Sequence, residues 1–336
     1  MRRRSTRLWV LSAALLALVP AGAARAQKHT WTGVERIVAV GDVHGDYGQF
    51  VKTLRAAKVI DAKGNWIAGK THLVQSGDVL DRAPESRKAM DLLMKLETQA
   101  AKAGGAVHAL IGNHEAMVLL DDLRYVHPGE VKALGGEKGF RQAMSPKGKY
   151  GKWICGHNAV IKINDLLFVH AGLRASFARM SMAQINKAVR AELAKGNWDG
   201  ISMSPSGPLW TRALAAGDED SVAKELDVVL KKFGARRMVV AHTVSTDGVY
   251  ARAGGRLIRI DVGMSEYYGG PAACLVVEKG TFYEVRHPAK KRKLPLKALP
   301  QPTTRPARAR PAARRRPSGA SVKLAEHQTR SPAGRG

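Results

Sequence analysis

Four short segments of the chain combine aspartate, histidine and asparagine in a pattern that favours metal binding. They are residues 41–45 (Gly-Asp-Val-His-Gly), 77–82 (Gly-Asp-Val-Leu-Asp-Arg), 112–115 (Gly-Asn-His-Glu) and 170–172 (His-Ala-Gly). Each follows a short apolar run that is typical of a buried strand, so the polar residues fall where the strand ends. Carboxylate and imidazole ligands together suit Mn, Fe or Zn. The repeated pattern therefore predicts a shared site for divalent metal ions.

A site for two ions about 3.5–4 Å apart needs a carboxylate that contacts both of them. Asp78, in the second segment, is placed for this bridging role. The chain has only two cysteines, Cys155 and Cys274, and so few thiolates argue against a structural zinc site. In an oxidising compartment the two could pair, but their wide separation in the sequence favours buried free thiols.

The elements that must position these residues alternate along the first part of the chain. Residues 34–40, 71–75 and 106–111 have the apolar composition of short buried strands. Between them, residues 47–57 and 86–102 have apolar side chains at helical spacing. This alternation predicts a sheet flanked by helices.

The second part of the chain predicts further strands, two of which deliver histidines. A hairpin over residues 159–169 leads to His170, and a strand over residues 237–241 leads to His242. The remaining expected elements are helices at 184–193 and 221–233 and strands at 256–261, 273–278 and 281–286. The expected fold class is α/β (α+β), a central two-sheet β-sandwich flanked by helices, with the dimetal site at the carboxyl ends of strands.

Two segments interrupt this pattern. Residues 121–158 are irregular and rich in glycine, and residues 196–220 lack a clear period. We expect both to be cap or insert regions that shape the substrate pocket.

The N-terminus has the features of an export signal. Residues 1–7 are arginine-rich, residues 8–19 form a short apolar run, and Ala24-Arg25-Ala26 matches a cleavage site. The sequence thus predicts a cleavable signal peptide over residues 1–26 and a periplasmic or secreted protein that starts near Gln27. An uncleaved anchor or a buried helix is the alternative, although the apolar run is shorter than the ~20 residues of a spanning helix.

The positive charge of the chain is concentrated at its ends. The formal net charge is +27, and residues 289–336 contribute fourteen basic side chains and one acid. This Pro-, Ala- and Arg-rich tail cannot bury a core and is predicted to be disordered. It is either a solvated tail or an electrostatic contact to an anionic surface. Because export is expected and most of the excess charge lies outside residues 27–288, no nucleic-acid partner is expected.

The motifs resemble those of the calcineurin-like metallophosphoesterases, in the same order and with about 35 residues between the first three. Within that family the chain is similar to the phosphoprotein phosphatase type, especially the bacterial Shewanella-like branch. The resemblance covers residues 35–285, within a predicted metallophosphoesterase domain of residues 27–288. It implies two divalent metal ions (Mn, Fe or Zn). The implied ligands are Asp42, His44, Asp78, Asn113, His170 and His242.

The resemblance also implies roles for residues that do not bind metal. His114 would be the general acid that protonates the leaving oxygen, and Asp81 would orient its imidazole. Arg82 would bind the phosphate, and Arg212, in the stretch Pro-Leu-Trp-Thr-Arg, is the candidate for a second phosphate-binding arginine.

Three of these residues could instead have no role in metal binding or catalysis. His242 could be a structural histidine, His114 could merely follow a ligand at a helix start, and Arg212 could be a solvated side chain. The chain also departs from the family pattern at Ala83, where a glycine usually follows the arginine. We expect this alanine to restrict the backbone at a tight turn without removing a ligand.

The implied reaction is hydrolysis of phosphomonoesters, through attack of a hydroxide that bridges the metals. The substrate would be a phosphorylated protein (pSer/pThr or pTyr) or a small phosphomonoester. A dinucleoside polyphosphate hydrolase is the enzyme alternative, but such relatives lack the pair Asp81-Arg82 and usually carry aspartate in place of Glu115. The non-enzyme alternative is an exported surface-binding scaffold that acts through the basic tail. Retention of every ligand position argues against this last reading.

Overall fold

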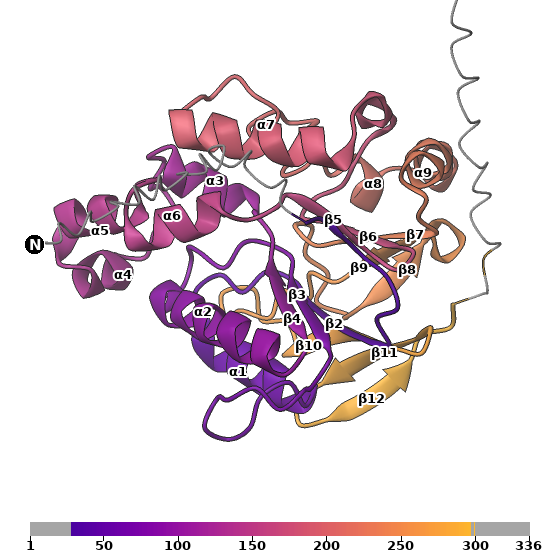
Figure 1. The fold of residues 1–336 in the computed structure, drawn as a ribbon, viewed down its shortest axis with the longest axis horizontal. Coiled ribbons are helices and arrows are strands. Elements are labelled where there is room, and N and C mark those ends of the chain that lie inside the picture. Colours follow the sequence, from indigo (N-terminus) through magenta and orange to yellow (C-terminus); the bar gives the residue numbers. More distant parts are fainter. Residues whose placement is uncertain (1–27, 297–298, 300–336) are drawn as a thin grey trace, which may run out of the picture. The chain divides into compact units, whose positions relative to one another are not determined.

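Two sheets stack against each other, and helices cover their outer faces (Figure 1). The computed structural model describes residues 28–296 and Leu299. The predicted two-sheet α/β architecture is thus confirmed. The predicted signal peptide and most of the predicted tail lie outside the described residues.

Within the described residues each sheet has six strands, and both sheets are mixed. In spatial order the first contains β1 (Thr30–Trp31), β5 (Val160–Ile163), β6 (Leu166–Val169), β7 (Arg237–Val240), β9 (Leu257–Arg259) and β8 (Tyr250–Arg252). The second contains β12 (Lys290–Lys293), β11 (Thr281–Arg286), β10 (Ala273–Glu278), β2 (Arg36–Val40), β3 (His72–Gln75) and β4 (Ala106–Ala109). The strands β2, β3 and β4 run parallel, as do β6, β7 and β9. Parallel strands bring their carboxyl ends to one edge, which is where the four motifs begin.

The helices are short except for three. In chain order they are α1 (Tyr47–Ala56), α2 (Ser86–Lys102), α3 (Asn113–Leu119), α4 (Pro128–Ala133), α5 (Gly136–Met144), α6 (Lys149–Cys155), α7 (Met182–Lys195), α8 (Ala213–Ala216) and α9 (Glu219–Phe233), with 3₁₀ turns at Ala175–Arg179 and Ala253–Gly255. Helix α2 forms where predicted because Ala89, Leu93 and Leu96 make one buried stripe. Ser181 begins α7 by accepting a hydrogen bond from the backbone N–H of Gln184.

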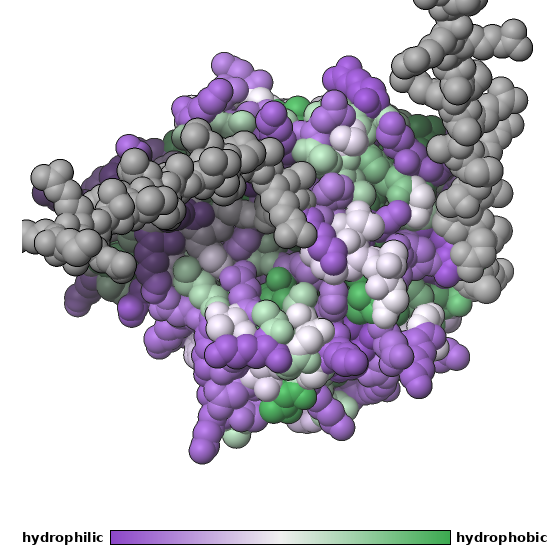
Figure 2. Space-filling model, viewed as in Figure 1, coloured by the Kyte–Doolittle hydropathy of each residue, from purple (hydrophilic) through white to green (hydrophobic). Residues whose placement is uncertain are grey.

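The core has two layers that follow from the alternation of side chains along each strand. Ile161 and Phe168 point between the two sheets and pack with residues of the second sheet such as Leu73. Their neighbours Val160 and Leu167 point the other way and pack beneath α7 and α9. The visible surface is mostly hydrophilic, with only scattered apolar areas (Figure 2).

The hairpin that delivers His170 is confirmed, since β5 and β6 pair in antiparallel fashion. Residues 121–158, expected to be irregular, instead fold into α4, α5 and α6. Strand β12 pairs with β11, so the folded part extends past the boundary predicted at residue 288.

Both cysteines are free thiols, as expected, but Cys274 is buried whereas Cys155 is only half-buried. Among the described helices, none combines the length and apolar character needed to cross a membrane.

Candidate metal centre

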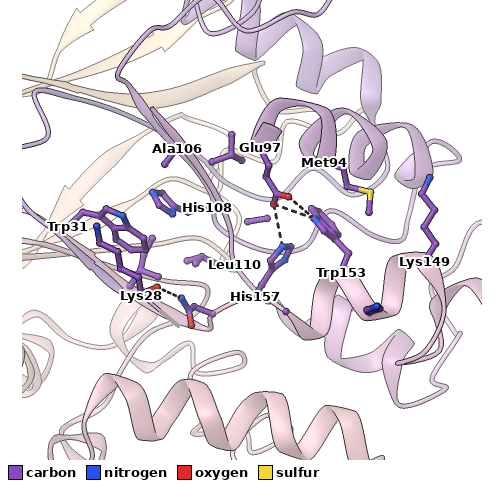
Figure 3. A pocket seen from close by; sticks show the side chains of 16 residues that line it. Lys28, Trp31, Met94, Glu97, Ala106, His108, Leu110, Lys149, Trp153 and His157 are labelled. Atoms are coloured by element: carbon purple, nitrogen blue, oxygen red, sulfur yellow. Dashed lines mark hydrogen bonds and ion pairs between the residues drawn. The ribbon is translucent and has the colours of Figure 1, made fainter. Parts of the chain in front are cut away.

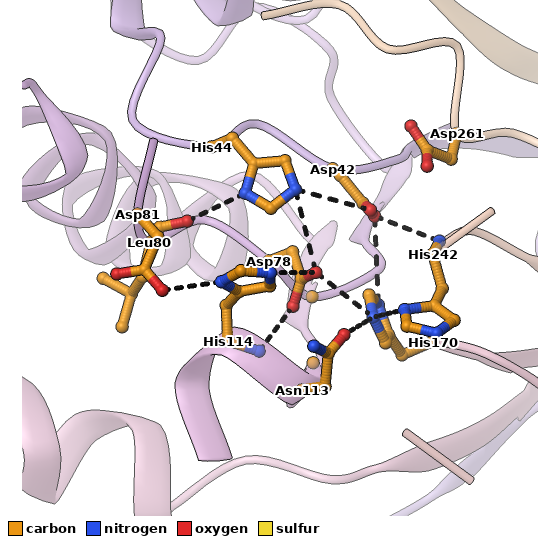
Figure 4. Close-up of polar contacts among 12 residues, drawn as sticks. Asp42, His44, Asp78, Leu80, Asp81, Asn113, His114, His170, His242 and Asp261 are labelled. Carbon is orange, nitrogen blue, oxygen red and sulfur yellow. Dashed lines mark hydrogen bonds and ion pairs between the residues drawn. The ribbon is translucent and has the colours of Figure 1, made fainter. Parts of the chain in front are cut away.

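The strand ends of both sheets bring the predicted ligands together (Figure 4). Asp42 and His44 follow β2, Asp78 follows β3, and Asn113 starts the helix after β4. From the other sheet, His170 directly follows β6 and His242 follows β7. All six side chains are buried.

The first group of ligand atoms surrounds one oxygen of Asp78. The Nε2 atom of His44 lies 3.8 Å from this Oδ2 and 3.9 Å from Oδ2 of Asp42. The Nε2 atom of His114 lies 3.9 Å from the same oxygen of Asp78. Asp78 therefore contributes to a first cluster with His44 and His114, whose ligand atoms can share one ion.

The second group shares the same Asp78 oxygen. The Nε2 atom of His170 lies 3.4 Å from Oδ2 of Asp78, 2.9 Å from Oδ1 of Asn113 and 3.2 Å from Nδ1 of His242. Since Asp78 takes part in both groups, it occupies the position expected of a bridging ligand. The inclusion of His242 argues against a purely structural role for this residue.

Hydrogen bonds to backbone carbonyls orient the three imidazoles. His44 and His170 each donate from Nδ1, to the carbonyls of Leu80 (3.0 Å) and Ser76 (2.8 Å). His242 donates from Nε2 to the carbonyl of Trp210 at 3.0 Å. A carbonyl oxygen can only accept, so the opposite nitrogen of each ring presents a lone pair to the cluster. Such outer hydrogen bonds are typical of metal-binding histidines.

The convergence of acceptor atoms requires positive charge. Around Nε2 of His170, the oxygens of Asp78 and Asn113 and a ring nitrogen of His242 lie within hydrogen-bond distance. The neutral ring of His170 carries its hydrogen on Nδ1, which donates to the carbonyl of Ser76. Its Nε2 therefore has no hydrogen, and none of these atoms can donate unless a proton is added. A shared cation, either a proton or a metal ion, resolves the repulsion. The residues therefore fit a divalent metal ion.

The pKa values of the centre also indicate that it is suited to binding a cation. Burial alone would raise the pKa of Asp78, but the imidazoles of His170 and His114 hold it well below its usual range. Burial lowers the pKa of His44 to about 4. Burial together with the nearby His170 lowers the pKa of His242 to about 3. At neutral pH, His44 and His242 are thus neutral and able to bind metal.

Asp261 is a further buried carboxylate that lies beside Asp42 (Figure 4). Its Oδ1 accepts a hydrogen bond from the N–H of Gly263 at 3.0 Å, whereas its buried Oδ2 has no partner. Burial raises the pKa of Asp261 to about 6, and burial with the neighbouring Asp261 raises the pKa of Asp42. Two adjacent carboxylates in a dry site favour bound positive charge.

His114 and Asp81 form a direct pair. Nδ1 of His114 lies 2.6 Å from Oδ2 of Asp81, and the opposite Nε2 faces Asp78. Burial opposes protonation of His114, but the carboxylates of Asp78 and Asp81 outweigh it and raise the pKa of the imidazole. A histidine held in this way can carry a proton at the edge of the metal site.

Half of the ten predicted site residues have a left-handed backbone. The φ angles are +48° at His44, +56° at Asp78, +72° at Asp81, +70° at Arg82 and +64° at His242. Such conformations cost about 1–3 kcal/mol each in residues other than glycine and concentrate at functional sites. Ala83, where a tight turn was expected, has no positive φ and fits the turn without strain.

The sequence did not predict the structural role that Glu115 has in the centre. Its buried carboxylate accepts backbone N–H bonds from Asp78 (2.7 Å), Val79 (2.8 Å), Leu80 (3.3 Å) and Gly112 (2.8 Å). These bonds join the second motif to the third. The backbones approach so closely that a Cβ at Gly77 would lie 2.6 Å from the Cα of Gly112. A glutamate three residues after a helix start is a capping signal that could have indicated this role.

The two predicted phosphate-binding arginines have different surroundings. Arg82 lies next to Asp81, and its buried Nε has no hydrogen-bond partner. Arg212 is exposed and donates from Nη1 to the carbonyl of His242 at 2.9 Å. Arg212 therefore lies at the edge of the second group of ligands.

A separate hollow of about 720 Å³ lies between α2, β4 and α6 (Figure 3). Trp31 and His108 line one wall, and Trp153, His157 and Glu97 line the other. None of its lining residues belongs to the metal centre.

Comparison with known proteins identifies the family. Residues 35–245 match the family model of the calcineurin-like phosphoesterases. The chain belongs to this family. It is therefore a hydrolase that acts on phosphoric esters, and the dimetal site of the family corresponds to the cluster described above.

Relatives place the chain within the Shewanella-like protein phosphatases. It is 30% identical to Shewanella-like protein phosphatase 1 of Plasmodium berghei, over 72% of this chain and 70% of the relative. It is 28% identical to Shewanella-like protein phosphatase 2 of Arabidopsis thaliana, over 69% and 72% of the two chains. A solved cold-active protein-tyrosine phosphatase from a psychrophilic Shewanella species superposes with a TM-score of 0.72 at 29% identity, covering 80% of this chain and 82% of the other.

Proposed function

We propose that the protein is a dimetal-dependent phosphatase that hydrolyses phosphomonoesters of proteins. The observation that carries this proposal is the shared position of Asp78 between two groups of buried ligand atoms. A carboxylate common to two sites is what paired hydrolytic metal ions need.

The first ion would be held by His44 and Asp78 together with Asp42, whose Oδ2 lies 3.9 Å from Nε2 of His44, and His114 of the same cluster would be kept for proton transfer. The second ion would be held by Asp78, Asn113, His170 and His242. The ligand types suit Mn, Fe or Zn. When bound, such ions supply Lewis acidity toward the phosphoryl group.

The chain itself supplies the proton for the leaving group. His114 donates this proton from Nε2, which lies 3.9 Å from Asp78 at the edge of the metal centre, while Asp81 holds the proton on Nδ1 and fixes the ring. The leaving oxygen departs as a neutral hydroxyl after His114 protonates it. No serine or cysteine nucleophile takes part.

The guanidinium groups bind the substrate. Arg82 lies beside the acid pair and has a buried donor without a partner, so a phosphoryl oxygen would satisfy it. Arg212, whose Nη1 donates to the carbonyl of His242, binds a second phosphoryl oxygen. The two arginines orient the phosphate for in-line displacement.

The protein nature of the substrate is supported by the relatives, which carry the names of protein phosphatases. Hydrolysis of dinucleoside polyphosphates is less well supported, because the pair Asp81-Arg82 and Glu115 depart from that enzyme type. An assay with pSer, pThr and pTyr peptides and a dinucleoside tetraphosphate, each across a panel of Mn, Fe and Zn, tests the assignment. Preference for the dinucleotide would contradict it.

Two substitutions test the metal centre directly. His44→Asn and Asp78→Asn should each abolish metal-dependent hydrolysis of an aryl phosphate, because each removes a ligand at the shared position. The exposed substitution Asp220→Asn, in α9, serves as the matched control. Full activity in either ligand variant would rule out the proposed mechanism.

Export is also part of the proposal, and it is supported by the sequence of residues 1–26 alone. N-terminal sequencing of the protein recovered from the periplasm or medium should find Gln27 or a near neighbour first. Deletion of residues 300–336 should leave turnover unchanged if the basic tail serves only for contact with an anionic surface.

A further inference from the structure

The guanidinium of Arg82 has no carboxylate partner within residues 28–296, and its buried Nε lacks a hydrogen-bond partner. A buried donor left unsatisfied is costly, so this Nε is free for a phosphoryl oxygen of the substrate.

Two tyrosine rings stabilise the positive charge of this guanidinium. The Cζ atom of Arg82 lies 4.0 Å from the ring centroid of Tyr125 and 5.1 Å from that of Tyr267. Both distances fall within the range of cation–π attraction. The rings come from different loops, since Tyr125 lies between α3 and α4 and Tyr267 lies between β9 and β10.

The backbone fixes both rings to the metal centre. The N–H of Arg82 donates to the carbonyl of Tyr125 at 3.0 Å, which also supports the left-handed backbone of Arg82. On the other side, the N–H of Glu266 donates to Asp46 at 2.9 Å. The rings of Tyr267 and Tyr268 meet edge to face at 4.9 Å.

These contacts continue to the predicted ligands and the acid. The ring of Tyr268 lies 5.4 Å from that of His44, and the ring of Tyr125 lies 5.4 Å from that of His114. Tyr125, Tyr267 and Tyr268 together form an aromatic rim. This rim contacts both His44, a predicted metal ligand, and His114, the proposed acid.

Both rings that face Arg82 are also open to solvent. Tyr125 is 37% exposed and Tyr267 is 61% exposed, which makes them two of the few large apolar side chains on the described surface. Exposed aromatic rings beside a phosphate-binding guanidinium offer a flat apolar surface where the leaving group of the ester must lie.

We propose that Tyr125 and Tyr267 are positioning and selectivity residues, which hold the Arg82 guanidinium in place and contact the aryl ring of phosphotyrosine. This inference rests on the proposed phosphatase function and names the substrate class of the same site. A phosphoserine side chain is too short and too small to reach both rings, so it gains only the phosphate contact. The rim therefore favours aryl over alkyl phosphates.

The test compares two peptides of one sequence that carry pTyr or pSer, with the metal-loaded full chain. Tyr125→Ala and Tyr267→Ala should each raise KM for the pTyr peptide and the Ki of inorganic phosphate by about threefold to thirtyfold, while kcat changes less. Tyr125→Phe and Tyr267→Phe keep the rings and should behave like the parent. Arg124→Ala is the matched control, because Arg124 also lies over Tyr125 but is paired with Asp122.

The ratio of kcat/KM for pTyr over pSer decides the selectivity. It should fall toward unity in the two alanine variants and stay unchanged in the phenylalanine variants. An unchanged ratio in both alanine variants of an active enzyme would overturn the inference, and so would an equal loss in the phenylalanine variants. Failure of the parent protein to hydrolyse either peptide would instead overturn the proposed function.

Discussion

Nδ1 of His114 lies 2.6 Å from Oδ2 of Asp81, and both side chains are buried at the edge of the metal centre. Asp81 reaches this position through a left-handed backbone, with φ of +72°. A strained residue that makes one short contact to a histidine is expected where that contact has a chemical purpose.

The first prediction concerns this pair. Asp81→Asn should lower kcat about 10-fold to 100-fold, because the amide no longer stabilises the protonated imidazole or fixes its tautomer. The loss should be smaller for p-nitrophenyl phosphate, whose leaving group needs little protonation, than for an alkyl phosphate. Steady-state kinetics with both esters measure this difference. Equal losses for the two esters would contradict the role of His114 as general acid.

The second prediction concerns the carboxylate of Glu115. Glu115→Gln places an amide group opposite backbone N–H groups that now donate to a carboxylate, so at least one loses its acceptor. The free energy of unfolding should fall by roughly 3 kcal/mol, measured by urea denaturation. Glu137→Gln, on the exposed face of α5, should have no comparable effect. A Glu115→Gln protein as stable as the parent would show that the two motifs are held together by other contacts.

The third prediction concerns metal removal. A chelator should lower Tm of the loaded protein by roughly 5–10 °C, since ligand binding at a hundredfold excess over Kd contributes about 2.7 kcal/mol. The Asp78→Asn variant, which lacks the shared ligand, should show little response to the same chelator. Differential scanning calorimetry measures both shifts. If chelation left the Tm of the parent unchanged, the clustered residues would not form a stable metal site.

The fourth prediction concerns pH and a residue away from the metal ligands. Burial raises the pKa of Glu130 in α4 to about 7, although its carboxylate accepts the N–H of Arg87. The folded state therefore binds a proton that the unfolded state releases near its ordinary pKa of 4.5. The stability from this group is complete below pH 4.5 and is lost as the pH rises through about 7.

Glu130→Gln should remove this part of the pH dependence, because the amide stays neutral. Urea unfolding at pH 5 and pH 8 should show a smaller loss of stability in the variant than in the parent. The exposed Glu137→Gln variant again serves as the control. A variant with the same slope as the parent would mean that other groups govern this pH range.

Much of the fold could be predicted because local patterns and tertiary packing agree. Helix α2 begins at Ser86 and ends at Lys102 as expected, since one apolar stripe covers its whole length. Strand β12 could not be predicted, because its sequence Lys-Lys-Arg-Lys has no strand-like composition. It forms by pairing with β11, and Lys291 forms an ion pair with Glu278 of β10 and Arg292 with Glu284 of β11.

The candidate site also contains residues that the sequence could predict and residues that it could not. The ligands after β2, β3 and β4 could be predicted, because parallel strands must bring their ends together. Tyr125 and Tyr267 could not, since they lie in loops whose paths are set by tertiary contacts. Only the folded chain reveals that Tyr267 reaches Arg82, far from it in sequence.

The ligand atoms come from both sheets of the sandwich, with Asp78 and Asn113 on one and His170 and His242 on the other. Neither layer alone holds a complete set for the second ion. An ion held there would link the two layers at this edge. Its removal should therefore make the backbone amides along this edge exchange hydrogen faster, while the far side of the sandwich stays protected.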